Sequence, residues 1–345
     1  MLGRFFLALL ASGAMLRAAS DSPDFKEVYD LLRAHAGSVT EAELNRASVE
    51  GLLSKLNSRA WLIDPARTSA PETNTDLVSS SAIFDENYGY IRISRVVGRL
   101  PEEFSAALER LAATNKLKGL VIDLRYAGGN DYASAGKVAD RFLGSEQPLL
   151  DWGNGTAKST DKTNAFRQPV AVLVNQFTTG AAEALAAVLR QKDVGLLIGT
   201  NTAGQASITK DFPLKNGAVL RIGVALVKLG DGEVVERLKP DIQVDVSPED
   251  ERAYFVDAFK NLNRLGTPVS TNVASLTVTN KSPRKRLNEA ELVRMLREGE
   301  TPEDELAKPT RLEPPKPVIT DPALARAIDL LKALAVVRQA APDSR

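Results

Sequence analysis

The chain has 345 residues, and 44 Lys and Arg residues balance 44 Asp and Glu residues, so the formal net charge is zero. This balance gives no support to nucleic-acid binding or to a basic membrane-binding surface. The sequence has no cysteine, which excludes disulfides, thiolate nucleophiles and cysteine-based metal sites, and it predicts no metal and no cofactor. The length suits two domains, or one large domain with extensions.

The first twenty residues have the three parts of an export signal. Arg4 supplies a positive start, residues 5–11 form a short apolar core, and Ala18-Ala19-Ser20 resembles a cleavage site before Asp21. The apolar core is too short to span a bilayer. We therefore predict an exported protein, periplasmic or secreted, with a signal peptide at about 1–20. Whether the signal is cleaved or serves as an anchor stays open.

Residues 21–64 are predicted to form an N-terminal helical region. Apolar residues between Phe25 and Leu32 recur at helical spacing, and Thr40 with Glu43 forms a capping box that opens a second helix. The following residues, 65–87, are polar and rich in turn formers, and they are predicted to be a linker.

The main domain is predicted at 88–247 as two successive strand–helix crossover units. Short apolar runs rich in Val, Ile and Leu suit buried parallel strands, and Ala-rich segments suit helices. Each unit has a glycine-bearing loop where a strand ends and a helix begins, which is where ligands collect on such sheets. We expect strands at 88–94, 119–124, 169–174 and 194–198, and helices from Pro101, over 132–142 and over 181–190.

The chain beyond 200 is predicted to contain a hairpin and a helical C-terminal region. Strands at 206–212 and 219–229 flank a Lys215-Asn216-Gly217 turn. The region 248–345 is predicted to be helical at 248–264 and 288–297, with a Pro-rich spacer at 308–322. A last helix begins at Pro322, and its apolar stripe either covers the core or pairs with another subunit. That stripe consists of Leu324, Ile328, Leu331 and Leu334.

Five blocks of the main domain follow one another as in the carboxyl-terminal processing peptidases, also called tail-specific proteases. They are GYIRIS, KGLVIDLRYAGGN, PVAVLVNQFTTGAAEALAAVL, GLLIGTNTAGQAS and LKPDIQV, in order between Tyr88 and Val246. The resemblance implies an α/β core of the crotonase and Clp-protease type, with a parallel-rich sheet, crossover helices and helical extensions at both ends. It also implies a serine endopeptidase in which a serine attacks and a lysine serves as general base.

The chain departs from this family pattern at both catalytic positions. The family serine lies three residues before a Glu that opens the helix, which is Glu183 here, so its position is Gly180. The position of the family lysine is Gln205, and an acidic residue present in some members falls on Gln191. Glycine has no side chain to attack with, and an amide does not accept a proton usefully near neutral pH. The resemblance therefore predicts a member without the dyad. We expect weak hydrolysis to return in a Gly180→Ser and Gln205→Lys double variant if the cleft is intact.

Neighbouring side chains are the alternative catalysts. Thr178, Thr179 and Ser207 carry hydroxyls, and Lys210 carries an amine. Lys210 starts roughly 16 Å along a strand from Gln205, at ~3.3 Å per residue, and strand alternation directs it to the other face. The competing interpretation is that a threonine caps the helix and the lysine is solvated.

The backbone part of the family site is predicted to survive. The resemblance implies that N–H groups of Gly128 or Gly129 and of Ala181 stabilise an oxyanion, and such groups also suit a carbonyl or a terminal carboxylate. The competing interpretation is that Gly128 and Gly129 only form a tight turn. Many family members insert a PDZ domain before the core, and the segment 65–87 is too short for one. Recognition of a peptide then falls to the cleft itself.

Three functions follow from the sequence. The first is an exported pseudo-peptidase that binds peptides or protein termini as a regulator or scaffold, with an active protease or another exported protein as its partner. The second is an active serine- or threonine-type endopeptidase that uses a residue outside the family pattern, such as Thr179. The third is a structural or assembly protein that acts through its terminal helices, for instance as a homodimer.

Overall fold

The computed structural model describes residues 23–56, 59–63, 76–260 and 318–340, which belong to two compact units. One unit, here the N-terminal unit, contains Met1–Thr73 and Thr209–Val224, and the other, the core unit, contains Asn74–Ile208 and Ala225–Arg345. The predicted signal peptide at 1–20, the helix predicted at 288–297 and most of the spacer at 308–322 lie outside the described residues.

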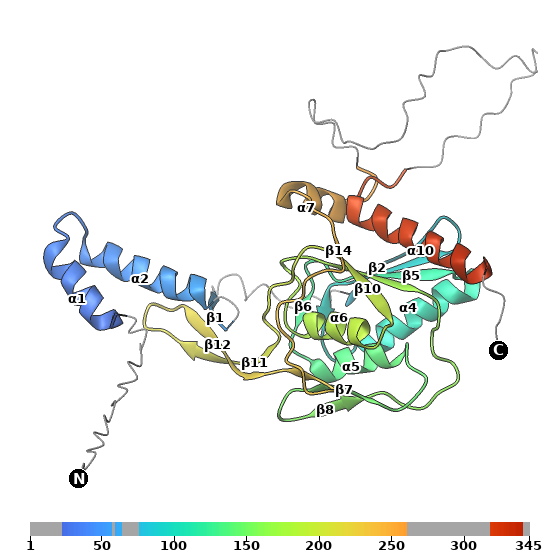
Figure 1. Cartoon of the computed structure of the whole chain (residues 1–345), viewed down its shortest axis with the longest axis horizontal. Helices are drawn as coiled ribbons and strands as arrows, with labels where there is room; N and C mark the ends of the chain where they lie inside the picture. The colour runs from blue at the N-terminus through green and yellow to red at the C-terminus, as the bar shows by residue number, and fades with distance from the viewer. Residues whose placement is uncertain (1–22, 57–58, 64–75, 261–317, 341–345) are drawn as a thin grey trace, which may run out of the picture. The chain divides into compact units, whose positions relative to one another are not determined.

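The N-terminal unit combines a pair of helices with a three-stranded antiparallel sheet (Figure 1). The predicted capping box is confirmed: the Thr40 hydroxyl accepts a hydrogen bond from Glu43 N at 3.2 Å, and the Glu43 carboxylate accepts one from Thr40 N at 2.9 Å. The sheet order is β1-β12-β11. The elements are α1 (Phe25–His35), α2 (Glu41–Lys55), β1 (Ala60–Ile63), β11 (Ser207–Pro213) and β12 (Val219–Leu226).

Two features of this unit bear on the sequence predictions. The predicted hairpin is confirmed, with Gly217 at φ 86° in its turn. The prediction of helix as far as residue 64 is wrong at its end, because residues 60–63 form β1, which pairs antiparallel with residues 219–222. Four consecutive apolar residues are too few for a stable helix, and the exposed edge of the hairpin supplies the main-chain partners of a strand.

A six-stranded sheet in the order β14-β10-β9-β5-β3-β2 forms the middle of the core unit. All of its neighbouring strands are parallel except β2, which runs antiparallel to β3. The four strands predicted for this sheet are confirmed. The bounds are β2 (Val78–Phe84), β3 (Tyr88–Ile93), β5 (Gly119–Asp123), β9 (Val170–Val174), β10 (Gly195–Gly199) and β14 (Ile242–Gln243).

The prediction of a linker at 65–87 is wrong for residues 78–84. These residues form β2, which pairs with β3 at the edge of the sheet. The segment reads VSSSAIF, and its three serines conceal the strand from an analysis based on hydrophobic runs. An edge strand tolerates serine because one of its long sides lacks a strand neighbour, and fewer of its side chains are buried.

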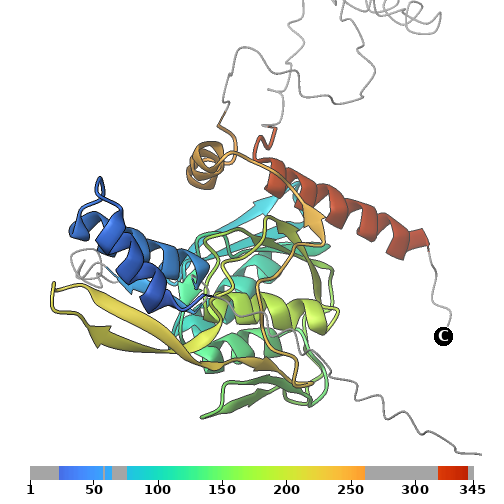
Figure 2. The same ribbon diagram turned by 60° about the vertical axis from the view of Figure 1, so that its left-hand side comes forward.

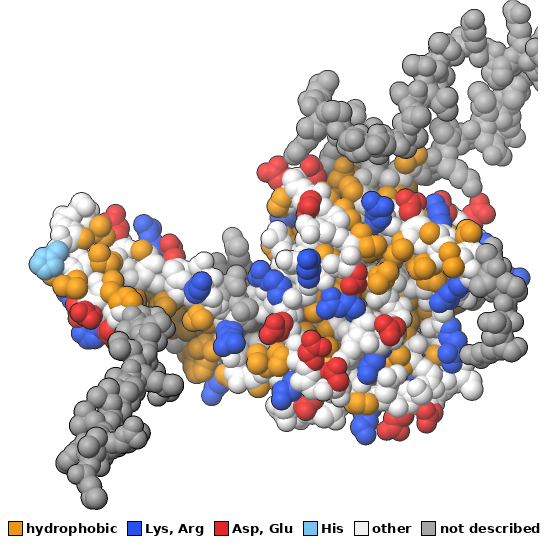
Figure 3. Space-filling model, in the orientation of Figure 1, with side chains coloured by type: hydrophobic (Ala, Val, Ile, Leu, Met, Phe, Trp, Pro, Cys, Tyr) orange, Lys and Arg blue, Asp and Glu red, His pale blue; other side chains and the backbone are white. Residues whose placement is uncertain are grey.

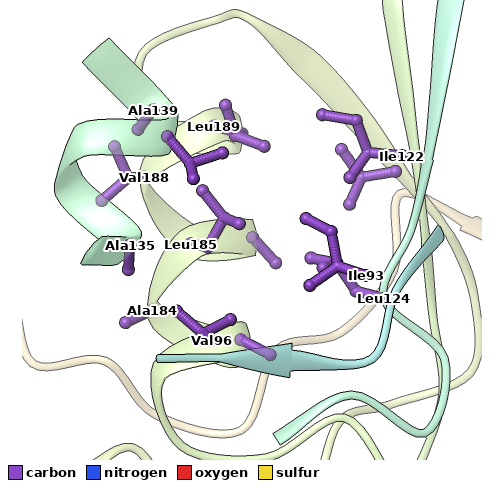
Figure 4. Packing of buried hydrophobic residues seen from close by; sticks show 14 of the residues in the cluster. Ile93, Val96, Ile122, Leu124, Ala135, Ala139, Ala184, Leu185, Val188 and Leu189 are labelled. Carbon is purple, nitrogen blue, oxygen red and sulfur yellow. The ribbon is translucent and has the colours of Figure 1, made fainter. Parts of the chain in front are cut away.

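Helices cover both faces of this sheet (Figures 1 and 2). Helices α4, α5 and α6 pack on one face, where their apolar side chains meet those of alternate strand residues. Figure 4 shows Leu185, Val188 and Leu189 of α6 between α5 and strand residues such as Ile122. The predicted crossover helices are therefore confirmed, as α4 (Leu100–Thr114), α5 (Tyr132–Asp140) and α6 (Ala181–Gln191).

Helix α10 (Pro322–Ala340) covers the opposite face, which settles where its apolar stripe lies. Leu324, Ile328 and Leu331 are buried against Val121 and Leu173 of the sheet. The helix belongs to the core unit. A second core forms on this face because the central strands are buried on both sides. Their successive apolar side chains point alternately to the two faces of the sheet.

A buried ion network fastens the start of α10 to the end of β5. The Arg125 guanidinium lies 2.7 Å from the Asp123 carboxylate and 2.8 Å from that of Asp321, which precedes α10. Burial raises the pKa of Asp123, but the Arg125 guanidinium outweighs this effect and holds that pKa below its usual range. Asp321 also accepts hydrogen bonds from the N–H groups of Ala323 and Leu324 and thereby caps the helix.

Shorter elements complete the core unit, and most of them were not predicted. Helix α7 begins at Pro248 as expected but ends at Val256, before the predicted 264. Two-residue strands β4 and β6 pair with each other in parallel, and β13-β7-β8 form a separate small sheet. Their bounds are β4 (Arg95–Val96), β6 (Gly128–Gly129), β7 (Pro148–Asp151), β8 (Thr156–Lys158) and β13 (Lys228–Leu229). None of the helices among the described residues has both the length and the apolar character to cross a membrane.

Candidate functional site

The turn between β9 and α6 places Gly180 immediately before the helix. Its backbone has φ 58° and ψ −123°, a conformation that side-chain-bearing residues rarely adopt. The carbonyl oxygen of Gly129 lies against its α carbon, so that a Cβ at Gly180 would come closer than 3.0 Å to that oxygen, a separation that real Cβ atoms essentially never show. The position that the family pattern assigns to the nucleophile therefore has no room for a side chain.

The second glycine-bearing loop lies directly beside this turn. Gly128 and Gly129 form β6 and are bonded to β4, so part of their main-chain hydrogen-bonding capacity is used within the fold. Gly129 has φ 140°, and a Cβ there would overlap the Val96 carbonyl. The Thr179 N–H donates to the Ala127 carbonyl at 2.9 Å. The structure thus brings together the two predicted loops, with the Gly129 carbonyl rather than a donor facing Gly180.

Ala181 is the first residue of α6 and is fully buried. As the first residue of a helix it has an N–H group without an intrahelical acceptor, and that group belongs to the positive end of the helix dipole. Of the three predicted backbone donors, Ala181 is the one at a helix start, whereas Gly128 and Gly129 are strand residues.

The turn that carries Gln205 is fastened to the start of α6 by Glu183. The Glu183 carboxylate accepts hydrogen bonds from Gly180 N at 3.1 Å, from Gly204 N at 2.6 Å and from Gln205 N at 2.7 Å. The Thr202 hydroxyl bonds to the same carboxylate. One fully buried side chain therefore holds the nucleophile position and the base position in a fixed relation.

Burial raises the pKa of Glu183 above its usual value of 4.5, and the hydrogen bonds from Thr202, Gln205, Gly204 and Gly180 offset part of that rise. The sequence prediction gave Glu183 no role beyond marking the position of Gly180, three residues before it. Its place in the first turn of a predicted helix is the signal that could have indicated its bonds to backbone N–H groups, because acidic side chains at this position accept such bonds.

Two of the alternative hydroxyls, those of Thr178 and Ser207, are buried. The Thr178 side chain is fully buried, donates to the Leu124 carbonyl at 2.9 Å and accepts from Asn175 N at 3.0 Å. The Ser207 hydroxyl is buried and has no hydrogen-bond partner among the described residues. The main-chain carbonyl of Ser207 accepts a hydrogen bond from the Tyr132 hydroxyl at 2.9 Å.

The remaining two alternatives are Thr179 and Lys210. The Thr179 Oγ1 atom faces Gly128, where a Cβ would come within 2.8 Å of it. Lys210 belongs to the N-terminal unit, and its ammonium lies 5.5 Å from the centre of the Phe212 ring. Thr179 is therefore the one alternative hydroxyl that lies between the two glycine-bearing loops.

An aromatic cluster beside these loops was not predicted. Tyr126, two residues before Gly128, has φ 62°, and its ring stacks on Phe177 at 5.2 Å between centres. The Tyr126 hydroxyl donates to Glu251 at 3.2 Å, and Asn175 Nδ2 donates to the same carboxylate at 3.0 Å. Burial, together with Glu251, raises the pKa of Tyr126. Only the sequence-distant helix α7 brings Glu251 here, so no local pattern indicated the cluster.

Comparisons with known proteins find similarity to one family of peptidases. The model of "Peptidase family S41" matches residues 87–244. A carboxy-terminal processing protease of Bacillus subtilis, CtpA, is 26% identical over 254 residues, covering 72% of this chain and 51% of the relative. A carboxy-terminal-processing protease of Bartonella bacilliformis is 28% identical over 197 residues, covering 52% of this chain and 45% of the relative. The chain spans about half the length of the curated relatives it matches.

A solved structure described as the photosystem II D1 C-terminal processing protease is 26% identical, with a TM-score of 0.39, and the match covers 46% of this chain and 42% of that one. The α/β core expected from the resemblance, with its parallel-rich sheet and crossover helices, is confirmed. Residues 87–244 of this chain thus match peptidase family S41, and the chain is similar to the carboxy-terminal processing proteases.

Proposed function

We propose that this chain is an exported, catalytically inactive S41 peptidase that binds peptides or protein termini as a regulator or scaffold. The observation that carries the proposal is the surroundings of Gly180. The nucleophile position has no side chain, and the Gly129 carbonyl occupies the direction in which one would project. The base position is an amide, Gln205, which does not accept a proton near neutral pH.

Loss of both catalytic groups removes peptide hydrolysis by this route. A nucleophile and its base act as a unit, so losing one abolishes most of the rate and losing the other adds little. The hydroxyl of Thr178 already makes two hydrogen bonds, which argues against it as a replacement. Strand alternation directs Lys210 to the face opposite that of Gln205, which argues against the lysine. Thr179 is the replacement that the assay below must exclude.

Binding without hydrolysis is the activity that the remaining groups support. The start of α6 at Ala181 favours negative charge, and the adjacent aromatic pair of Tyr126 and Phe177 offers apolar surface, since Phe177 is 42% exposed. A peptide terminus combines a carboxylate with apolar side chains. An active protease or another exported protein would present such a terminus to this site.

Incubation of the purified chain with unfolded, fluorescein-labelled casein tests the proposal, with trypsin as the positive control. We expect no turnover by the wild-type chain and none by Thr179→Ala. Turnover by the wild-type chain that disappears in Thr179→Ala would replace this proposal with an active threonine-type endopeptidase. Fluorescence anisotropy of labelled decapeptides, with free or amidated C-termini, then measures binding, and equal failure of both sets to bind would contradict the peptide-binding role.

A second candidate, assembly through the N-terminal helices, is favoured by exposed apolar side chains. Phe25, Leu31 and Leu52 of α1 and α2 are 58%, 53% and 50% exposed. Figure 3 shows apolar side chains gathered over these helices. Light scattering of the wild type and of a Phe25→Ser, Leu31→Ser variant tests this function. A monomeric wild type at micromolar concentration would exclude the homodimer.

A further inference from the structure

An open groove of about 510 Å³ lies in the core unit, beside the edge of the six-stranded sheet at which β5 and β9 begin. One wall is the end of α4 and the residues after it as far as Leu117, two residues before β5. The other wall is residues 163–168, which end two residues before β9, and Arg141 after α5 completes the lining. None of the lining residues belongs to the glycine-bearing loops at 128–129 and 180.

The groove combines apolar surface with positive charge. Apolar surface comes from three lining residues, Ala112, Leu117 and Phe166. The Arg141 guanidinium is paired with the Glu109 carboxylate at 3.2 Å. Lys116 and Arg167 are exposed, and neither side chain has a hydrogen-bond or ion-pair partner among the described residues. Two positive charges thus remain unpaired beside apolar surface, and charge complementarity favours an occupant that carries an acidic side chain.

The end of α10 lies beside this groove. Arg338, in the last turn of α10, donates a hydrogen bond from Nη1 to the main-chain carbonyl of Arg167 at 3.1 Å. Leu334 and Arg338 also line a smaller pocket together with Pro169, which follows the wall of the groove. The last turns of α10 and the groove therefore lie on either side of residues 167–169.

The five residues that follow α10 in the chain are Ala341, Pro342, Asp343, Ser344 and Arg345. An extended chain covers up to ~3.6 Å per residue, so Asp343 can reach roughly 11 Å and Arg345 roughly 18 Å from the last residue of the helix. Pro342 cannot continue a helix, which favours an extended path for this segment. The segment is therefore long enough to pass residues 167–169 and enter the groove, and it carries an acidic side chain.

We propose that residues 341–345 lie in the groove of their own chain, with the Asp343 carboxylate between the Lys116 ammonium and the Arg167 guanidinium. Pro342 then covers the apolar surface of the groove. Because the segment is tethered to α10, its effective concentration at the groove is on the order of millimolar, and contacts too weak to hold a free peptide are sufficient. The segment joins α10, on one face of the sheet, to α4 and α5 on the other. This role is independent of the proposed function.

The test is electron paramagnetic resonance of a nitroxide attached to a Ser344→Cys variant of the full chain, whose native sequence has no cysteine. A bound segment gives a broad, immobilised spectral component, and we expect this component to make up more than half of the signal. Arg167→Glu should reduce the immobilised fraction at least threefold, because it places a negative charge beside Asp343. Lys137→Glu is the matched control, since Lys137 is exposed on α5 and lies outside the groove lining, and it should leave the spectrum unchanged.

A second comparison changes only the segment and stays informative if Arg167→Glu does not fold. Asp343→Arg should reduce the immobilised fraction as Arg167→Glu does, and the two changes together should restore part of it. A mobile spectrum for the wild-type groove, or a spectrum that neither charge change alters, would overturn the proposal. Immobilisation that disappears on dilution to low micromolar concentration would also overturn it, because a second copy would then supply the segment.

Discussion

The Glu183 carboxylate accepts the backbone N–H of Gln205 at 2.7 Å, across a gap of 22 residues in the chain. The same carboxylate accepts the N–H of Gly180, so a single side chain joins the positions at which the family pattern has its nucleophile and its base. Glu183 thus joins the turn that carries Gly180 to the turn that carries Gln205.

Restoring the family residues is expected to fail. Gly180→Ser places a Cβ against the Gly129 carbonyl and forces a side chain into φ 58°, which costs on the order of 1–3 kcal/mol for the backbone alone. The sequence predicted weak recovered hydrolysis for Gly180→Ser with Gln205→Lys. The structure changes that expectation to a destabilised and inactive double variant, as measured by urea unfolding and by casein hydrolysis.

The control for this prediction is Gly153→Ser, at a glycine with φ 88° and no atom within 4 Å of its would-be Cβ. It carries the backbone strain without the steric overlap, so it should cost less than Gly180→Ser. Equal stability losses in the two variants, or measurable hydrolysis by the double variant, would show that the loop at Gly129 moves aside.

Glu183→Gln is expected to lower the free energy of unfolding by about 1–3 kcal/mol. The glutamine NH₂ group would face the N–H of Gly204 or Gln205, which leaves two donors opposed where the carboxylate accepted both. Chemical denaturation measures the loss. Glu102→Gln on the exposed start of α4 is the control and should change stability by less than about 0.5 kcal/mol. A similar loss in both variants would show that the hydrogen bonds accepted by Glu183 do not stabilise the fold.

The raised pKa of Glu183 predicts how this difference depends on pH. The folded chain holds the Glu183 proton more tightly than the unfolded chain, whose carboxyl has its usual pKa of 4.5. The corresponding stability is fully present below pH 4.5 and is lost as the pH rises through the folded-state pKa. The difference in unfolding free energy between wild type and Glu183→Gln should therefore shrink as the pH rises from 4 to 8. A difference that grows with pH would show that the hydrogen bonds outweigh burial.

Asp321→Ala is expected to destabilise the core unit by about 3–5 kcal/mol, because it removes one partner of a buried ion network and the cap of α10. Limited proteolysis should then cleave α10 earlier than in the wild type. Asp329→Ala, on the same helix with a side chain that is 72% exposed, is the control and should leave the cleavage rate unchanged. Unaltered protection of α10 in Asp321→Ala would show that apolar burial alone holds the helix.

Thr178→Val is expected to cost about 1–3 kcal/mol, since the isosteric side chain loses the bonds to Leu124 O and Asn175 N. The Asn175 N–H then loses its hydroxyl acceptor, whereas the Leu124 carbonyl keeps the Ala127 N–H at 3.0 Å. Thr178→Ser keeps the hydroxyl and should retain most of the stability. Thermal unfolding distinguishes the two variants. If Thr178→Val were as stable as Thr178→Ser, the hydroxyl would have no structural role and would return as a candidate nucleophile.

The sequence by itself determined the repeating strand and helix units of the core, the two glycine-bearing loops, and the residue types at positions 180 and 205. These depend on local periodicity and residue chemistry, which require no knowledge of the path of the chain. The sequence also located the apolar stripe of α10 but did not determine what covers it, because periodicity reveals which side of a helix is apolar and not which surface lies against it.

Only the tertiary structure decided that residues 60–63 pair with a hairpin more than 150 residues later, that VSSSAIF is an edge strand, and that the Gly129 carbonyl fills the space beside Gly180. It also decided that Glu183 reaches Gly204 and Gln205. Each of these contacts joins segments that are distant in sequence, and each depends on a hydrogen bond or a steric overlap that exists only after the hydrophobic cores have brought the segments together.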